Sequence, residues 1–119
     1  MARVLIVEDD LPIAGMIADE LAHCGHVPDV VGNGAEALAS LSVYRPDAIV
    51  LDLMMPVMHG WEFIERYRDV TGGREIPMIV VSAAGAVTKS MEALGVKRFI
   101  PKPFDLQDLA RTVDAIIDG

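Results

Sequence analysis

The 119-residue sequence lacks most features of exported, membrane-spanning or nucleic-acid-binding proteins. Its one cysteine, Cys24, excludes an internal disulfide and fits a reducing cytoplasm. No apolar run approaches the length that spans a bilayer, and the run after Arg3 is too short for a signal-peptide core. With 10 basic and 18 acidic residues, the net charge is −8, which disfavours binding to phosphates. We therefore expect a cytoplasmic protein that binds neither membranes nor nucleic acid, although it could hold a divalent cation.

What the sequence does contain is an alternation of short apolar runs and amphipathic stretches. The apolar runs, rich in β-branched residues, are 3–7, 27–31, 48–51, 78–81 and 98–100. Stretches with helical periodicity follow them at 11–24, 34–41, 60–68, 87–94 and 105–117. Strand followed by helix, five times, predicts an α/β fold with a parallel sheet covered by helices on both faces. We expect one domain over residues 1–119, because no linker or internal repeat interrupts this order.

Local residue patterns predict how the helices begin and which side chains they bury. Asp10 and Asp105 are expected to cap the first and last helices. The spacing of the apolar residues in the first helix predicts one buried face, composed of Ile13, Met16, Ile17, Leu21 and Cys24. Cys24 is thus interpreted as a small core residue. The three histidines have no metal-ligand spacing and are expected at the surface or in loops.

Polar residues gather where the predicted strands end. The first strand ends in Glu8 and Asp9, the third in Asp52, the fourth in Ser82 and the fifth just before Lys102. Open parallel sheets place their sites at the carboxyl edge, where these ends meet. An acid after a single apolar run is ordinarily a cap or turn residue, and Ser82 alone is uninformative. Their joint occurrence predicts a shared crevice that Asp52 faces.

The residue types in this crevice suit phosphoryl chemistry. Carboxylates held within a few ångströms repel one another unless a cation lies among them, and Mg²⁺ prefers such oxygen ligands. One carboxylate, Asp52, could then attack phosphorus and form an aspartyl phosphate. The transferred phosphoryl oxygens would need positive charge and hydrogen-bond donors, which Mg²⁺, Lys102 and Ser82 could supply.

Four motifs carry a resemblance to a known family. The segments VEDD (7–10), VLDLMMPVMHG (50–60), VVSA (80–83) and FIPKPF (99–104) resemble the receiver domain of two-component response regulators. The resemblance covers essentially the whole chain, and residue types, order and spacing agree. It implies a flavodoxin-like (βα)5 fold with a five-stranded parallel sheet in the order 2-1-3-4-5, whereas periodicity alone does not determine the order of the strands.

The resemblance also implies a role for each acid in the site. Asp52 matches the phosphoacceptor, and Asp9 matches a direct Mg²⁺ ligand. Glu8 would act on the metal through water, and the backbone carbonyl of Met54 would complete the protein's share of the coordination. Met54 stands where many relatives carry a polar residue, which would alter the access of water to the phosphoryl group.

Three further residues match the family's switch and pairing positions. Ser82 matches the hydroxyl that moves toward the phosphoryl group, and Lys102 matches the lysine that pairs with it. In the family the peptide bond matching Lys102–Pro103 is cis, which an X-Pro bond permits at low cost. Phe99 stands at the aromatic switch position. The stretch between Ser82 and Lys102 is short, and the deficit falls in the fourth predicted helix.

The implied function is signalling rather than turnover of a substrate. A sensor histidine kinase or a histidine phosphotransfer protein would supply the phosphoryl group, and the domain would catalyse only its own phosphorylation and dephosphorylation. Phosphorylation would shift the population toward a form with a changed surface on the fourth helix, fifth strand and fifth helix, which binds a downstream effector. A weak homodimer through that surface is left open.

Two other classes of function remain open from the residues alone. A Mg²⁺-dependent phosphohydrolase would place carboxylates at the same edge, but position 54, two after Asp52, is methionine and offers no second acid. A receiver-like interaction module that is not phosphorylated would have the same fold. The presence of the acid pair, Asp52, Ser82 and Lys102 argues against that module.

Overall fold

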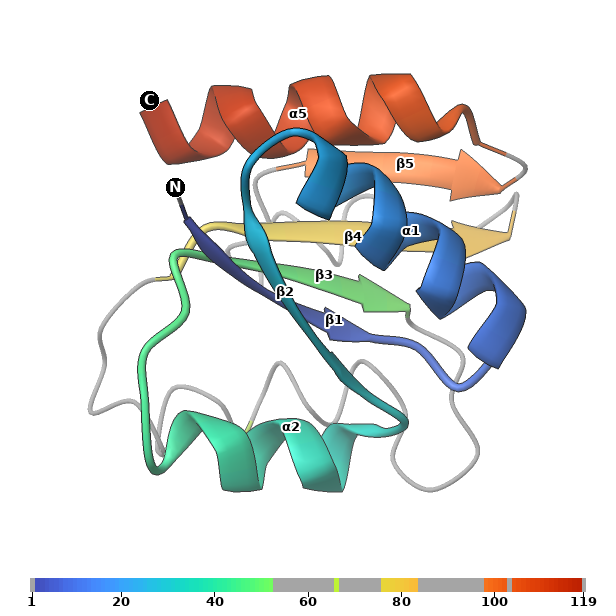
Figure 1. The fold of residues 1–119 in the computed structure, drawn as a ribbon. Coiled ribbons are helices and arrows are strands. Elements are labelled where there is room, and N and C mark those ends of the chain that lie inside the picture. The colour runs from blue at the N-terminus through green and yellow to red at the C-terminus, as the bar shows by residue number, and fades with distance from the viewer. Residues whose placement is uncertain (1, 53–65, 67–75, 84–97, 103, 119) are drawn as a thin grey trace.

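The computed structural model describes residues 2–52, 66, 76–83, 98–102 and 104–118. Within these ranges five strands and three helices are assigned, and Figure 1 shows their arrangement. The strands are β1 (Arg3–Val7), β2 (Val27–Val31), β3 (Ala48–Asp52), β4 (Met78–Ala83) and β5 (Arg98–Lys102). The helices are α1 (Leu11–His23), α2 (Gly34–Leu41) and α5 (Leu106–Asp118). The helices predicted over 60–68 and 87–94 lie outside the described residues, apart from position 66.

The five strands form one sheet in the order β2-β1-β3-β4-β5, and every neighbouring pair is parallel. This confirms the flavodoxin-like order that the resemblance implied. Three strands extend one or two residues beyond their predicted ends, so that Asp52, Ser82 and Lys102 belong to the strands themselves. The reversal of strand order between β1 and β3 is the place where open α/β sheets have their crevice.

Alternate side chains of the central strands enter two separate cores, one on each face of the sheet. From β1, Leu5 and Val7 join the core beneath α2, whereas Val4 and Ile6 join the core beneath α1 and α5. Figure 1 shows α2 on one side of the sheet and α1 with α5 on the other. β3 is buried along its whole length, as expected of a strand in the middle of a parallel sheet.

Each described helix begins with a side chain that accepts hydrogen bonds from its first backbone N–H groups. The Asp10 carboxylate accepts from the Ile13 N–H at 3.2 Å, and Asn33 accepts from the Glu36 N–H at 2.9 Å. The Asp105 carboxylate accepts from the N–H groups of Gln107 and Asp108. The capping roles predicted for Asp10 and Asp105 are thereby confirmed.

The apolar face predicted for the first helix is partly wrong. Ala14, Ile17 and Leu21 are the buried residues of α1, whereas Met16 is 51% exposed and Cys24 is exposed. Cys24 is a cap rather than a core residue because α1 ends at His23 and the chain turns away through Gly25, whose φ is 92°. Its side chain therefore leaves the helical register that the spacing assumed.

Two of the three histidines lie in the described residues, in or next to the turn after α1. His23 is exposed at the end of α1, and His26 lies in the connection to β2, so both fit the predicted surface or loop positions. His26 is nevertheless partly buried and hydrogen-bonded to Asp114 of α5, a contact that the sequence did not predict. His59 lies outside the described residues.

A polar network ties β1, β2 and the chain after α2 together. The Arg3 guanidinium donates to Asp29 at 3.0 Å and lies over the Tyr44 ring, 4.2 Å from its centroid. The Tyr44 hydroxyl donates to the same Asp29 carboxylate at 2.9 Å. Burial, together with this hydrogen bond to a carboxylate, raises the pKa of Tyr44 to about 12.

Within the described ranges, no helix is both long and apolar enough to cross a membrane.

Candidate functional site

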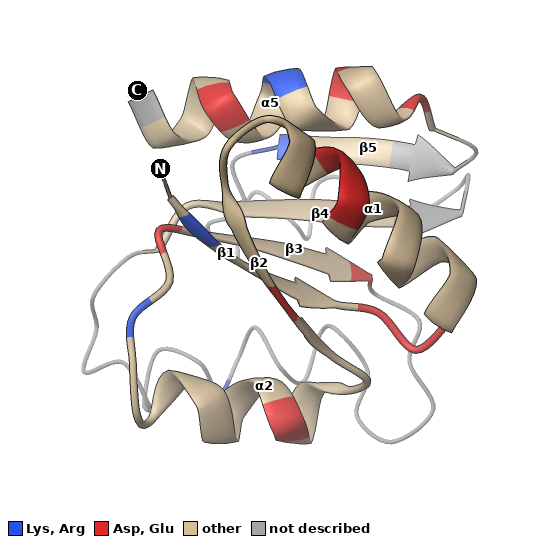
Figure 2. Cartoon of the chain, viewed as in Figure 1, with Lys and Arg blue, Asp and Glu red and all other residues tan. Residues whose placement is uncertain are grey.

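The strand register brings the acids of two strands to one edge of the sheet. Val7 lies opposite Leu51 in the parallel pair of β1 and β3, so Glu8 leaves the sheet beside Asp52. The Glu8 backbone N–H donates to the Val31 carbonyl at 3.1 Å, which holds it at the end of the β1–β2 ladder. Figure 2 shows acidic residues directly after β1 and at the tip of β3.

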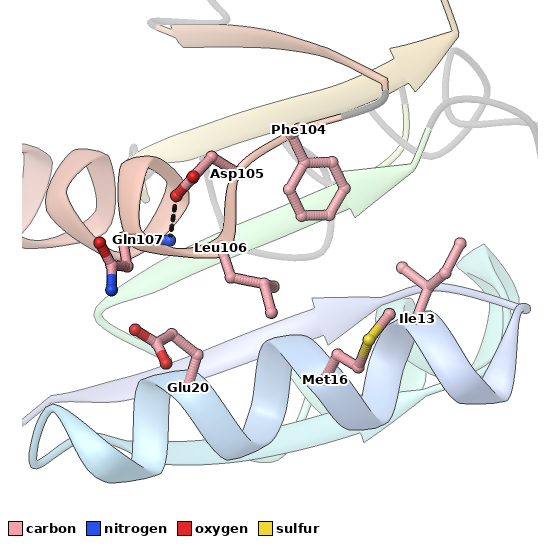
Figure 3. Close-up of a pocket in the computed structure, with 7 residues that line it drawn as sticks. All are labelled: Ile13, Met16, Glu20, Phe104, Asp105, Leu106 and Gln107. Atoms are coloured by element: carbon pink, nitrogen blue, oxygen red, sulfur yellow. Dashed lines mark hydrogen bonds between the residues drawn. The ribbon is translucent and has the colours of Figure 1, made fainter.

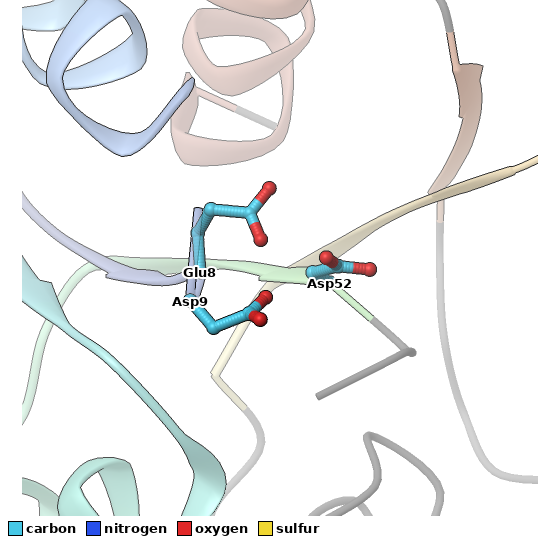
Figure 4. Close-up of side chains that lie close together, drawn as sticks. All are labelled: Glu8, Asp9 and Asp52. Carbon is cyan, nitrogen blue, oxygen red and sulfur yellow. The ribbon is translucent and has the colours of Figure 1, made fainter. Parts of the chain in front are cut away.

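Three carboxylates meet at this edge. Each of Glu8, Asp9 and Asp52 offers a carboxylate oxygen, and these oxygens lie within 4.8 Å of one another (Figure 4). Glu8 is 3% and Asp52 6% exposed, whereas Asp9 is exposed. Glu8 and Asp52 are thus buried at this edge of the sheet, and Asp9 lies at the surface. The acid cluster predicted from the strand ends is present.

The donor set of this acid cluster fits a hard divalent cation. Its ligands are all oxygens from carboxylates, the type that Mg²⁺ and Ca²⁺ prefer. Like charges at these separations repel, and a cation among them would turn that repulsion into attraction. Asp9 is exposed, so solvent reaches one of the three carboxylates. The residues present therefore suit the Mg²⁺ that the sequence predicted.

The strands beyond β3 end at the same edge. Asp52 lies opposite Val81 in the β3–β4 pair, so Ser82 is the next residue of β4 beyond Asp52. In the β4–β5 pair, Ser82 lies opposite Pro101 and Ala83 opposite Lys102. The backbones of the predicted site residues therefore follow one another across three neighbouring strands. Met54 and Pro103 lie outside the described residues.

Phe99, the predicted switch residue, lies on the α2 side of the sheet. It pairs with Val80 in register, is partly buried and packs against the core that contains Leu5, Leu51 and Val80. An aromatic ring at the margin of a core has room to change its packing more readily than one that is fully enclosed. Its role as a switch stays a prediction.

A groove of about 890 Å³, which we call the α1–α5 groove, lies on the opposite side of the sheet (Figure 3). Its walls are Ile13, Met16 and Glu20 of α1 and residues 104–107, which open α5. In Figure 3, Leu106 points toward α1, and Ile13 and Met16 extend from the side of α1 that faces Phe104 and Leu106. Sequence reasoning missed this groove because it assigned Met16 to the buried face. The spacing of Met16 from Ile13 suited the core, and only the structure shows that Met16 lies beside the buried Ala14–Ile17–Leu21 stripe rather than on it.

Residues 4–114 match the family described as the response regulator receiver domain. The chain belongs to this family. A curated relative, the response regulator MprA of Mycobacterium ulcerans (strain Agy99), is 32% identical over 117 residues, which cover 97% of this chain and 50% of the relative. The chain therefore spans about half the length of the curated relatives that it matches.

Solved structures of receiver domains share the fold along the whole chain. The Vibrio cholerae chemotaxis protein CheY4 has a TM-score of 0.89 at 30% identity and covers 98% of both chains. The receiver domain of the sensor histidine kinase PA1611 from Pseudomonas aeruginosa PAO1 has a TM-score of 0.88 at 27% identity, covering 99% of this chain and 98% of that one. That structure has a magnesium ion coordinated in its active-site cleft. The chain is thus a receiver domain of two-component signalling in sequence and in fold.

Proposed function

We propose that Asp52 of this receiver domain accepts a phosphoryl group from a phosphohistidine, in a reaction that requires Mg²⁺. One observation carries the proposal: Glu8, Asp9 and Asp52 bring carboxylate oxygens within 4.8 Å of one another at the carboxyl edge of the sheet. Asp52 is 6% exposed at the end of a fully buried strand, so the protein holds its backbone in a defined place. A nucleophile that is held in place reacts faster, because less orientational freedom is lost on reaching the transition state.

The reaction exchanges one bond to phosphorus for another. A carboxylate oxygen of Asp52 forms the new O–P bond while the N–P bond of the phosphohistidine breaks, and the departing imidazole nitrogen keeps the bonding electron pair. We assign Asp9 and Asp52 as direct ligands of the metal, with Glu8 acting through water and Met54 through its carbonyl. Bound there, Mg²⁺ supplies positive charge that offsets the charge on the phosphoryl oxygens.

We propose that two residues at neighbouring strand ends stabilise the negative charge on the other phosphoryl oxygens. Lys102 would pair with one phosphoryl oxygen, and the Ser82 hydroxyl would donate a hydrogen bond to another. Their backbone positions support this assignment, since Ser82 lies on β4 next to β3 and Lys102 lies on β5 next to β4. Movement of Ser82 toward the phosphoryl group would let Phe99 repack and change the surface that includes β5 and α5. That surface would bind the downstream effector.

We propose a sensor histidine kinase or a histidine phosphotransfer protein as the donor, and the α1–α5 groove as its contact. Along the chain, the walls of the groove begin four residues after Asp9 and two residues after Lys102, which supports a contact close to the site. Its apolar lining includes the exposed side chain of Met16, the kind of surface that a protein partner covers. We further propose that residues 1–119 act as one receiver domain located in the cytoplasm.

The test is the intact mass of the protein after incubation with acetyl phosphate, with and without Mg²⁺. We expect wild type to gain the mass of one phosphoryl group only when Mg²⁺ is present, and Asp52→Asn to gain none. Asp19→Asn is the matched control, because Asp19 is an exposed aspartate on α1 outside the acid cluster. Circular dichroism would verify that each variant is folded. Equal labelling of wild type and Asp52→Asn, or none in either, would overturn the proposal.

A further inference from the structure

His26 joins two parts of the molecule that are far apart in sequence. It lies in the turn between α1 and β2, and its Nε2 is 2.6 Å from the carboxylate of Asp114 on α5. Its Nδ1 accepts a hydrogen bond from the backbone N–H of Ala2, just before β1, at 3.3 Å. The His26 side chain is only 11% exposed, although it lies in a surface turn. Figure 1 shows this turn beside α5 and the amino terminus.

These two contacts define the tautomer of the neutral ring. A backbone N–H can only donate, so the Nδ1 that faces Ala2 must present a lone pair. The hydrogen of a neutral imidazole then resides on Nε2, from which it is donated to the Asp114 carboxylate. The contacts therefore assign the neutral Nε2–H tautomer to His26.

A second proton cannot be added to this arrangement without loss of one contact. Both nitrogens of an imidazolium are donors, so a protonated Nδ1 would meet the Ala2 N–H donor to donor. The bond to Asp114 would at the same time become charge-assisted and stronger. Protonation thus favours one of the two contacts and removes the other.

We propose that His26 is a proton-operated clamp: the neutral ring ties the start of β1 to α5, and the imidazolium keeps α5 while it releases the start of β1. The release has a defined place to act, because the Ala2 carbonyl accepts from the Val27 N–H at 2.8 Å, at the start of the β1–β2 ladder. Low pH should therefore weaken the hydrogen bond from the Val27 N–H to the Ala2 carbonyl, while α5 stays in place.

Among the charged groups around the His26 ring, Asp114 is the one that contacts it directly. From α5, the Asp114 carboxylate contacts Nε2 directly. On the β1 side, the Arg3 guanidinium is engaged by Asp29, and the Arg3 backbone N–H by Asp47. The other titratable side chains of the turn, His23 and Cys24, are exposed. The clamp does not involve Asp52, so its failure would leave the proposed phosphorylation untouched.

The test is nuclear magnetic resonance of the whole chain as the pH is lowered through the range in which histidines titrate. The ¹⁵N shifts of the His26 ring should report the Nε2–H tautomer at the high-pH end. On protonation, the exchange protection factor of the Val27 amide should fall about 2- to 10-fold, the range of one lost hydrogen bond, while α5 amides keep theirs. An Nδ1–H tautomer at high pH, or unchanged Val27 protection when the ring protonates, would overturn the clamp.

Two substitutions separate the two contacts. In His26→Gln the side-chain amide nitrogen stands near the position of Nε2 and can donate to Asp114, but no acceptor stands at the position of Nδ1, so Val27 protection should be low at every pH. In His26→Asn the shorter amide can accept from Ala2 but does not reach Asp114, so Val27 should stay protected and protection near Asp114 should fall. His23→Gln, which changes the exposed histidine of the same turn, should retain the pH response of wild type. A pH response at Val27 that persists in His26→Gln would refute the assignment to His26.

Discussion

Val7 and Leu51 lie opposite one another in the parallel pair of β1 and β3, and both are fully buried. This pairing determines where the chain emerges from the core, because the next residues on the two strands are Glu8 and Asp52. A shift of the register by one residue would turn the side chains of one strand to the other face of the sheet. The acid cluster therefore depends on the apolar packing behind it.

Magnesium should stabilise the wild-type fold through the acid cluster. At about 100 times its dissociation constant, a ligand that binds only the native state adds about 2.7 kcal/mol to the free energy of unfolding. Thermal unfolding with MgCl₂, against NaCl of equal ionic strength, should show the corresponding rise in Tm. Asp9→Asn should lose most of this rise, since Asp9 is a proposed direct ligand. An equal rise in both proteins would place the bound ion elsewhere.

Truncation of a buried leucine should cost far more than truncation of an exposed one on the same helix. Leu21 of α1 is 1% exposed and Leu11 is 72% exposed. Leu21→Ala should lower the free energy of unfolding by about 2–5 kcal/mol, because it removes apolar contacts and leaves a cavity. Leu11→Ala should change it by about 0.5 kcal/mol or less. Urea denaturation measures both, and similar losses would mean that α1 packs differently.

Removal of the cap of α2 should destabilise the domain. Asn33 accepts from the Glu36 N–H, and the Glu36 carboxylate in turn accepts from Asn33 and from the Gly32 N–H. Asn33→Ala should cost about 1 kcal/mol, since it leaves helix N–H groups without this acceptor. Asp19→Ala, an exposed mid-helix substitution on α1, is the control and should be nearly neutral. Urea midpoints that move equally would contradict the capping role.

The Tyr44 phenol should ionise later than an ordinary tyrosine. Its pKa is raised from 10.0 to about 12 by burial and by the hydrogen bond to Asp29. Because the folded-state pKa lies above the unfolded one, Tyr44 contributes stability that is fully present below about pH 10 and lost as the pH rises toward about 12. Ultraviolet titration of the phenolate measures this pKa. In Tyr44→Phe, Tyr67 is the one remaining tyrosine, so its titration can be recorded separately. A single ordinary transition that contains both tyrosines would show that the hydrogen bond is absent.

Loss of the Met16 side chain should slow phosphoryl transfer from a protein donor but not from a small one. Met16 lines the α1–α5 groove at 51% exposure, and a partner that docks there would bury it. We expect Met16→Ala to reduce transfer from a histidine phosphotransfer protein about 5-fold or more, as for a central interface residue. Labelling by acetyl phosphate should be unchanged. Val43→Ala, 81% exposed and away from the groove lining, should affect neither reaction.

The sequence by itself determined the elements that the structure describes and the edge at which the acid cluster lies. Strand and helix periods are local properties, and so are the caps at Asp10 and Asp105, whose partners lie two or three residues away. The chemistry of the site could be predicted for a related reason. Parallel strands all end at one edge, which placed Glu8, Asp9 and Asp52 there, and the family's strand order, with β1 beside β3, brought their carboxylates together.

Only the tertiary structure shows how the α1 region contacts α5 and how much of the surface between them stays exposed. The contact of His26 with Asp114 joins positions 88 residues apart, and nothing in the local pattern of either predicts it. Met16 is half exposed because residues 104–107 leave a groove beside it, although its spacing suited the core. A helical period specifies which residues share a face, but the neighbour and its distance set how much of that face is covered. That is why the site could be anticipated, whereas the groove and the His26 clamp could not.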